Sequence, residues 1–462
     1  MPSRRRFPCS RGAALLVVGG LILGVIPGCT SARPEVSHRV GAGTAASLDA
    51  SDRAAGPTPL TPPLSGESPF DAGERMLRSR AAAVNARARD GWLARVSGLS
   101  LRGQQGQMFD RMLSMGVIGL RLVSLTGLSP ARAPTSTLTP STGPGASTVR
   151  AGARFAYRLA GFDTADRTFD VDLSLRFAPS VDAQPQVVAW APHDRPQPWD
   201  LSQLTVRRSA TSLVLASSPE LAADLLARAE TAQSNVATVW GHARPAVWVA
   251  PTTDTEAARL LGREPVALRD VAAVTDGPLV LGRPAGADRV VIVPGAWSSL
   301  AGGGRDVVAT HELTHVVVRG STTGAVPLWL SEGFAELVAY RTVALPERDI
   351  VRPALEVARR SGLPTALPSA SEFDPAAGGV PAAYGLSLLV VRTLAERDGV
   401  AAVVRFYREV ADPSGGSRSN TVPTPDGSDQ QHAVDQALAS ALQTNRAALV
   451  RAWRARVERL VS

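Results

Sequence analysis

Two histidines and a glutamate stand close together in the segment His311-Glu312-Leu313-Thr314-His315. Residues four apart project from one face of an α-helix, so both imidazoles can reach the same ion. Zinc accepts imidazole nitrogen and carboxylate oxygen, and it needs only three protein ligands when it is catalytic. Glu312 is placed to hold a water molecule and take its proton, while the ion lowers the pKa of that water. The motif predicts a zinc site with Glu312 as general base. The alternative is a pair of ordinary histidines on an amphipathic helix.

A second segment, Pro327-Leu328-Trp329-Leu330-Ser331-Glu332-Gly333-Phe334-Ala335-Glu336, follows a turn that residues 319–324 can supply. It resembles the helix of gluzincin peptidases in which a Trp-Leu-x-Glu-Gly pattern presents a glutamate to the metal. The resemblance implies that Glu332 is the third zinc ligand. It also implies that Glu336, one helical turn further on, accepts a hydrogen bond from a zinc-bound histidine. The alternative for Glu336 is a solvated charge on the helix.

The stretch from about residue 240 to the C-terminus resembles the peptidase MA-like family of bacterial metallohydrolases, most specifically across residues 305–340. That resemblance implies hydrolysis of a peptide or protein substrate. It also makes Tyr384 the candidate for stabilising the oxyanion, against the alternative of a packed aromatic. The predicted strand 289–293 occupies the place of the family's edge strand, which pairs with an extended peptide. A purely structural strand is the alternative.

The N-terminus has the pattern of an export signal. Four arginines within residues 1–11 precede an apolar stretch from Ala13 to Ile26, which is too short to span a bilayer comfortably. It ends in Ile26-Pro27-Gly28-Cys29, which resembles the bacterial lipobox except at Pro27. The resemblance implies a signal peptide over 1–29, lipidation of Cys29 and an extracytoplasmic protein anchored to the membrane surface. Secretion without an anchor and an uncleaved signal anchor are the alternatives.

The remaining chain is predicted to have the α+β fold class. Residues 30–66 are rich in Ser, Thr, Pro, Gly and Ala and are predicted to form a disordered tether. Residues 67–216 form the first domain, with a helix over 71–97 followed by antiparallel strands, vaguely like the nuclear-transport-factor-2-like cone. Residues 217–462 form the second domain, which is expected to have the gluzincin layout of a small sheet and a mostly helical C-terminal half.

Charge and composition exclude other classes. The net charge is +8, but every basic residue is an arginine and these are scattered among acidic residues, so nucleic-acid binding is not expected. The densest group lies on the predicted helix 71–97 and is interpreted as a solvated face. The competing function is a lipoprotein binding module with a structural or inactive zinc site. A structural site would usually be closed by a fourth protein ligand, and Glu312 would then have no role.

Overall fold

The computed structural model describes residues 68–462 except 131–146, 179–183, 279, 281, 375–377 and 413–427. The predicted signal segment with Cys29 and the predicted tether lie outside these residues. The described chain confirms the α+β fold class, because a sheet domain is followed by a mostly helical C-terminal half. None of its helices combines the length and the hydropathy that a membrane span needs. Among the described residues, one compact unit comprises 68–157 and 168–194, and the other comprises 158–167 and 195–462.

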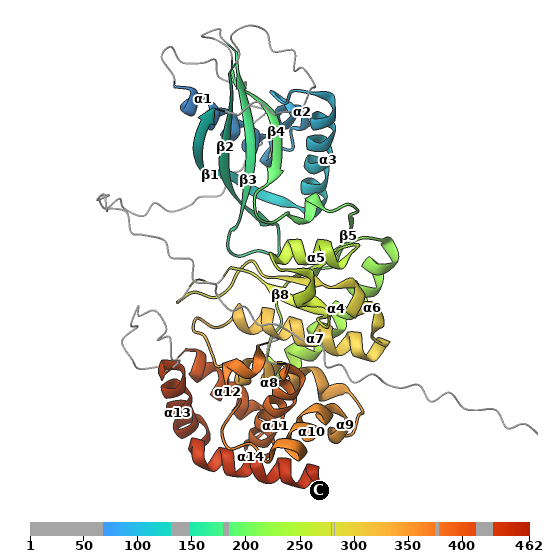
Figure 1. The fold of residues 1–462 in the computed structure, drawn as a ribbon, viewed down its shortest axis with the longest axis vertical. Helices are drawn as coiled ribbons and strands as arrows, with labels where there is room; N and C mark the ends of the chain where they lie inside the picture. Colours follow the sequence, from blue (N-terminus) through green and yellow to red (C-terminus); the bar gives the residue numbers. More distant parts are fainter. Residues whose placement is uncertain are drawn as a thin grey trace, which may run out of the picture. The chain divides into compact units, whose positions relative to one another are not determined.

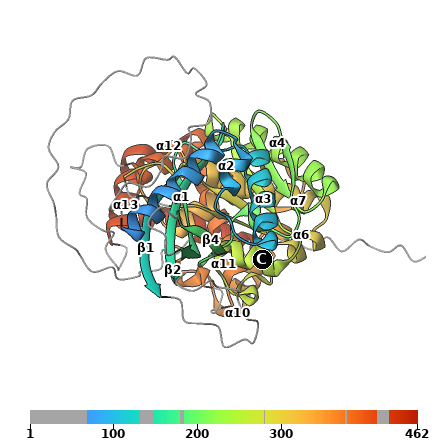
Figure 2. The same ribbon diagram turned by 90° about the horizontal axis from the view of Figure 1, so that it is seen from above.

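The first unit places three helices before a sheet of four strands in the order β1-β2-β3-β4. The elements are α1 (Pro69–Asn85), α2 (Arg89–Leu93), α3 (Leu99–Met115), β1 (Val117–Pro130), β2 (Ser147–Leu159), β3 (Arg167–Phe177) and β4 (Gln186–Pro192). Burial alternates along the first part of β3, as expected for a strand with one covered face. Helix α1 packs against β1 (Figure 2). The likeness to a nuclear-transport-factor-2-like cone stays a prediction.

The helix predicted over 71–97 is two helices, and a third one follows. The chain leaves α1 at Asn85, and Arg87 has a positive φ of 55°, a conformation that ends a helix. Residues 99–115, expected among the strands, form α3 instead. Helix α3 buries Met108, Phe109 and Met112 on one side, a helical spacing that is less distinct in the sequence than the strand pattern downstream.

Arg80 corrects the prediction of a fully solvated arginine face. Its side chain is buried with only 2% exposure, and its guanidinium lies 4.1 Å from the centroid of the Trp92 ring. It donates hydrogen bonds to the Trp92 carbonyl and the Gln105 side chain. Burial lowers the pKa of Arg80 to about 9. Arg80 is therefore part of the core of this unit, held by carbonyls and an aromatic face.

The second unit contains a sheet of five strands in the order β5-β6-β7-β9-β8. The strands are β5 (Thr205–Arg208), β6 (Ser212–Ala216), β7 (Ala246–Ala250), β8 (Ala273–Asp276) and β9 (Arg289–Ile292). Strands β6, β7 and β9 run parallel, and β5 and β8 are antiparallel to their neighbours. The apolar run Leu213–Leu215, assigned to the first domain from sequence, lies in this sheet. The local sequence does not predict how the edge strands β5 and β8 pair, because strand order depends on contacts between segments distant along the chain.

Strand β9 corrects the edge-strand prediction. It lies between β7 and β8, and all four of its residues are buried. The edge next to the metal helix is formed by β8, which pairs with β9 alone in antiparallel register, Thr275 facing Val290. Strand β8 is four residues long and lacks the continuous β-branched pattern of β9, so the local sequence does not predict it.

The helices of the second unit hold the candidate site. Helix α7 (Gly302–Arg319) packs on α4 (Pro219–Trp240) and contacts β8 and β9, and α8 (Leu328–Ala339) packs on both α7 and α11 (Val380–Asp398) (Figure 1). A Cβ at Gly333 would lie 2.4 Å from the Ser387 carbonyl oxygen, so glycine is required where α8 meets α11. The other helices are α5 (Asp254–Leu261), α6 (Pro294–Ser299), α9 (Glu347–Ile350), α10 (Arg352–Ser361), α12 (Val400–Ala411), α13 (Ser428–Leu442) and α14 (Arg446–Val461).

Candidate metal centre

Helix α7 carries the two histidines through the middle of the second unit. Every residue from Val307 to Val318 is buried, because the helix is covered by the sheet, α4 and α8. Within this helix the two imidazole rings lie one turn apart and meet edge to face, with their centroids 4.8 Å apart. Glu332 comes from α8, whose close approach to α11 is permitted by Gly333. The packing of helices α7, α8 and α11 thus positions the polar cluster inside an apolar core.

Three ligand-type atoms converge at one point. His311 Nε2 lies 2.9 Å from His315 Nε2 and 3.2 Å from Glu332 Oε2. His315 Nε2 lies 3.3 Å from the same carboxylate oxygen. Among the residues that the structure describes, His311, His315 and Glu332 form the group of metal-ligating side chains that could hold an ion. The cluster predicted from sequence is therefore assembled in the fold.

The donor set fits zinc. Atoms that each bind a tetrahedral zinc at about 2.0–2.2 Å are separated by roughly 3.3 Å, close to the distances found here. Two imidazole nitrogens and one carboxylate oxygen are also the ligand types of catalytic zinc sites. Without a cation, two Nε2 atoms at 2.9 Å would have to share one proton in a site shielded from water. The geometry shows that a metal ion can be held, and zinc is the identity we propose below.

Glu336 orients the first histidine. Its Oε1 lies 2.9 Å from His311 Nδ1. A carboxylate can only accept, so Nδ1 carries a proton, and in the neutral imidazole that binds a cation the Nε2 lone pair then faces the cluster. The side chain of Glu336 is 14% exposed, so it is not the freely solvated charge of the alternative interpretation. On the second histidine, Ser331 Oγ lies 3.5 Å from His315 Nδ1, at the limit of a hydrogen bond.

The electrostatics of the cluster favour a positive charge. Burial alone would lower the pKa of His311, but its hydrogen bonds to Glu332 and Glu336 outweigh burial and raise that pKa to about 10. Burial alone would raise the pKa of Glu332, but the two imidazoles outweigh it and hold that pKa at about 2. Carboxylates that stabilise an imidazolium this strongly also stabilise a metal cation bound by the neutral imidazoles.

We expect Glu336→Gln to weaken zinc binding by roughly 10- to 100-fold, the usual effect of losing an outer hydrogen-bond partner of a metal histidine. The amide keeps the size of the side chain but removes the charge that helps His311 bind a cation. Competition with a chelating dye would measure the dissociation constant. Glu356→Gln, an exposed glutamate on α10, is the matched control. An unchanged constant in Glu336→Gln would show that its hydrogen bond has no role in metal binding.

Glu312 is completely buried beside the cluster. Its Oε2 accepts a hydrogen bond of 2.6 Å from the Thr275 hydroxyl on β8. Its Oε1 is also buried and makes no hydrogen bond with any residue that the structure describes. Burial raises the pKa of Glu312, and the nearby imidazoles and Thr275 act against this rise. A carboxylate with one oxygen held and one oxygen free is suited to accept a proton from water.

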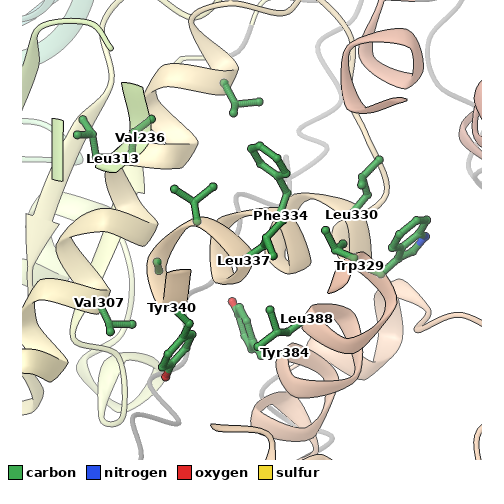
Figure 3. Packing of buried hydrophobic residues seen from close by; sticks show 14 of the residues in the cluster. Val236, Val307, Leu313, Trp329, Leu330, Phe334, Leu337, Tyr340, Tyr384 and Leu388 are labelled. Atoms are coloured by element: carbon green, nitrogen blue, oxygen red, sulfur yellow. The ribbon is translucent and has the colours of Figure 1, made fainter. Parts of the chain in front are cut away.

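Tyr384 lies in the same core. Its ring centroid is 6.1 Å from that of His311, and Figure 3 shows its hydroxyl directed toward helix α8, which carries Glu332. The hydroxyl is buried and makes no well-formed hydrogen bond with the described residues. Burial first, then the charges of three glutamates, hold the pKa of Tyr384 well above its usual value, so the phenol stays protonated. Tyr340, a second buried tyrosine, caps the end of α8, and burial raises the pKa of its phenol as well.

Two polar residues around the site were not identified from the sequence. Thr275 contacts Glu312, and the Ser331 hydroxyl lies beside His315 Nδ1. Thr275 stands in a short apolar run, Ala272-Ala273-Val274-Thr275, which contains no motif. No signal in the sequence would have paired it with Glu312, because the contact joins two elements that meet only in the folded chain.

Neither a scan against protein-family models nor a search of the curated proteins finds a match to this chain.

Proposed function

We propose that this chain is a zinc metallopeptidase of the gluzincin type, similar to the peptidase MA-like family, that hydrolyses peptide bonds. One observation carries the proposal. His311, His315 and Glu332 converge within 3.3 Å, and the buried Glu312 next to them keeps one carboxylate oxygen free. Three residues that could hold one metal ion, with an unpaired base beside them, are the arrangement that metal-assisted hydrolysis requires.

The cluster supports catalysis better than a structural role. Structural zinc sites are usually closed by four protein ligands, whereas catalytic sites have three and leave one position for water or substrate. Three ligand residues are grouped here among the described residues. Burying a carboxylate oxygen that makes no hydrogen bond costs free energy. In the competing binding module, Glu312 would have no role that explains this cost.

When bound, zinc supplies Lewis acidity that polarises a carbonyl group and makes water acidic near neutral pH. Glu312 Oε1 accepts the proton of the attacking water and delivers it to the leaving amine. The raised pKa of Glu312, caused by burial, brings the base closer to neutrality, where it can accept and release a proton. Tyr384, kept protonated by its raised pKa, donates a hydrogen bond to the oxyanion.

Strand β8 takes the substrate-pairing role that the sequence analysis gave to residues 289–293. It is the edge strand of the sheet, and it lies against helix α7, which carries the histidines. An extended peptide can add to such an edge through main-chain hydrogen bonds, while side-chain contacts select the sequence. This pairing would place the scissile bond beside Glu312, since Thr275 on β8 contacts that residue.

The expected result of metal removal tests the proposal. The full chain, freed of metal with a chelator, should lose hydrolysis of fluorogenic peptides and regain it on addition of about one equivalent of zinc. The chelator-treated protein should also unfold at a lower temperature, because an ion that binds the folded state stabilises it. Hydrolysis that persists after the zinc has been removed, as verified by elemental analysis, would contradict a zinc mechanism.

A further inference from the structure

Thr275 makes the only side-chain hydrogen bond that the described residues offer to the Glu312 carboxylate. Its hydroxyl lies 2.6 Å from Glu312 Oε2 and 3.1 Å from the backbone oxygen of the same residue. A hydroxyl has one proton to donate. The shorter distance is that of a charge-assisted O–H···O⁻ bond, so the hydroxyl donates its hydrogen bond to the carboxylate.

This bond makes the two carboxylate oxygens inequivalent. Oε2 is occupied by Thr275, whereas Oε1 is buried and makes no hydrogen bond with the described protein groups. A carboxylate that was held by neither oxygen could rotate about its last side-chain torsion, which has a broad minimum. The threonine therefore fixes which oxygen is left to accept a proton from water.

The hydroxyl is itself held firmly, because the end of the β8–β9 pair next to Thr275 is fastened by the turn between β2 and β3 and by the first residue of β3. Asp276, the next residue of β8, accepts a bond of 2.6 Å from Arg167. Its partner across the ladder, Arg289, forms a two-pronged ion pair with Asp163 at 2.6 and 2.7 Å. Both members of that second pair are buried. Paired bonds of this kind are geometrically demanding and limit movement of the strand.

We propose that Thr275 is a positioning residue for the general base: it orients the Glu312 carboxylate so that Oε1 alone faces the reacting water. The proposal rests on the proposed peptidase function. It also links the edge strand, where a peptide would pair, to the proton acceptor, so that one short strand serves substrate binding and base orientation.

Two variants separate the hydroxyl from the shape of the side chain. Thr275→Val keeps the β-branched form and removes the hydroxyl, and Thr275→Ser keeps the hydroxyl. On a fluorogenic peptide that the wild type cleaves, Thr275→Val should lower kcat by about 10- to 100-fold, as a misplaced catalytic group does, with KM within roughly twofold. Thr275→Ser should recover most of the rate. Thr393→Val, which removes a hydroxyl bonded to a carbonyl of α11, is the control and should keep the wild-type kcat.

A second measurement decides the inference even without a substrate. Crystal structures of the zinc-loaded variants should show the Glu312 carboxylate rotated or in two positions in Thr275→Val and as in the wild type in Thr275→Ser. A wild type that cleaves peptides, with Thr275→Val equal to it in kcat, would overturn the role of Thr275 and leave the peptidase proposal standing. If the wild type cleaves nothing, the peptidase proposal fails, and an unmoved carboxylate in Thr275→Val would overturn the positioning role as well.

Discussion

Replacing Glu332 by alanine should strip the protein of most of its zinc. The variant keeps two imidazoles but loses the carboxylate oxygen that lies 3.2 and 3.3 Å from them. Loss of a hydrogen-bond partner of a metal-bound histidine already weakens zinc binding by roughly 10- to 100-fold. Loss of a direct ligand should therefore weaken it by more than about 100-fold. His311→Ala and His315→Ala should behave in the same way, because each removes one of the three candidate ligands found among the described residues.

Elemental analysis after extensive dialysis would measure this effect. The wild type should retain about one zinc per chain, and the three ligand variants should retain little. Glu356→Ala, which removes an exposed glutamate of α10, should keep the full content. Full zinc content in Glu332→Ala would mean that another residue completes the site, and the assignment of the third ligand would then be wrong.

Glu312→Gln should nearly abolish hydrolysis while leaving zinc and fold intact. The amide removes the proton acceptor but keeps the size of the side chain, and its oxygen can still accept the Thr275 hydrogen bond. General base catalysis contributes typically about 10²- to 10⁴-fold, and kcat should fall by at least this much because the same group orients the water. The melting temperature should not fall, since the substitution also removes the cost of burying a charged carboxylate.

Tyr384→Phe is the comparison for that variant. It should lower kcat by roughly 10- to 10³-fold, the effect of losing one oxyanion donor, with zinc content unchanged. The larger loss in Glu312→Gln than in Tyr384→Phe would separate proton transfer from oxyanion stabilisation. Equal losses in both variants would contradict the division of roles proposed here.

The two histidines of the candidate metal centre were predictable from sequence because their geometry is local. Residues i and i+4 on a helix share a face whatever the fold, so the pairing of His311 with His315 follows from spacing alone. Glu332 and Glu336 needed the resemblance of a second segment, whose glycine proves to be a packing requirement between α8 and α11. The fold class was also within reach, since strand and helix periodicities differ.

Contacts between distant segments were not predictable. The position of β8 at the sheet edge and of β9 inside it depends on pairings between residues far apart in the chain. Thr275 meets Glu312 only through that pairing. Similarly, Arg80 sits in an arginine-rich stretch that looks solvated, and its burial depends on Trp92 and Gln105 from later segments. Local patterns therefore predicted the candidate ligands, whereas the structure identified the residues that contact them.

The most direct test of the account is the cleavage of a broad peptide library by the full chain, followed by mass spectrometry, in the wild type and in Glu312→Gln at equal zinc content. The account predicts cleavage by the zinc-loaded wild type and at least about 100-fold less product with the variant. Equal turnover by the two proteins would contradict Glu312 as the general base, and cleavage by neither would contradict the peptidase assignment itself.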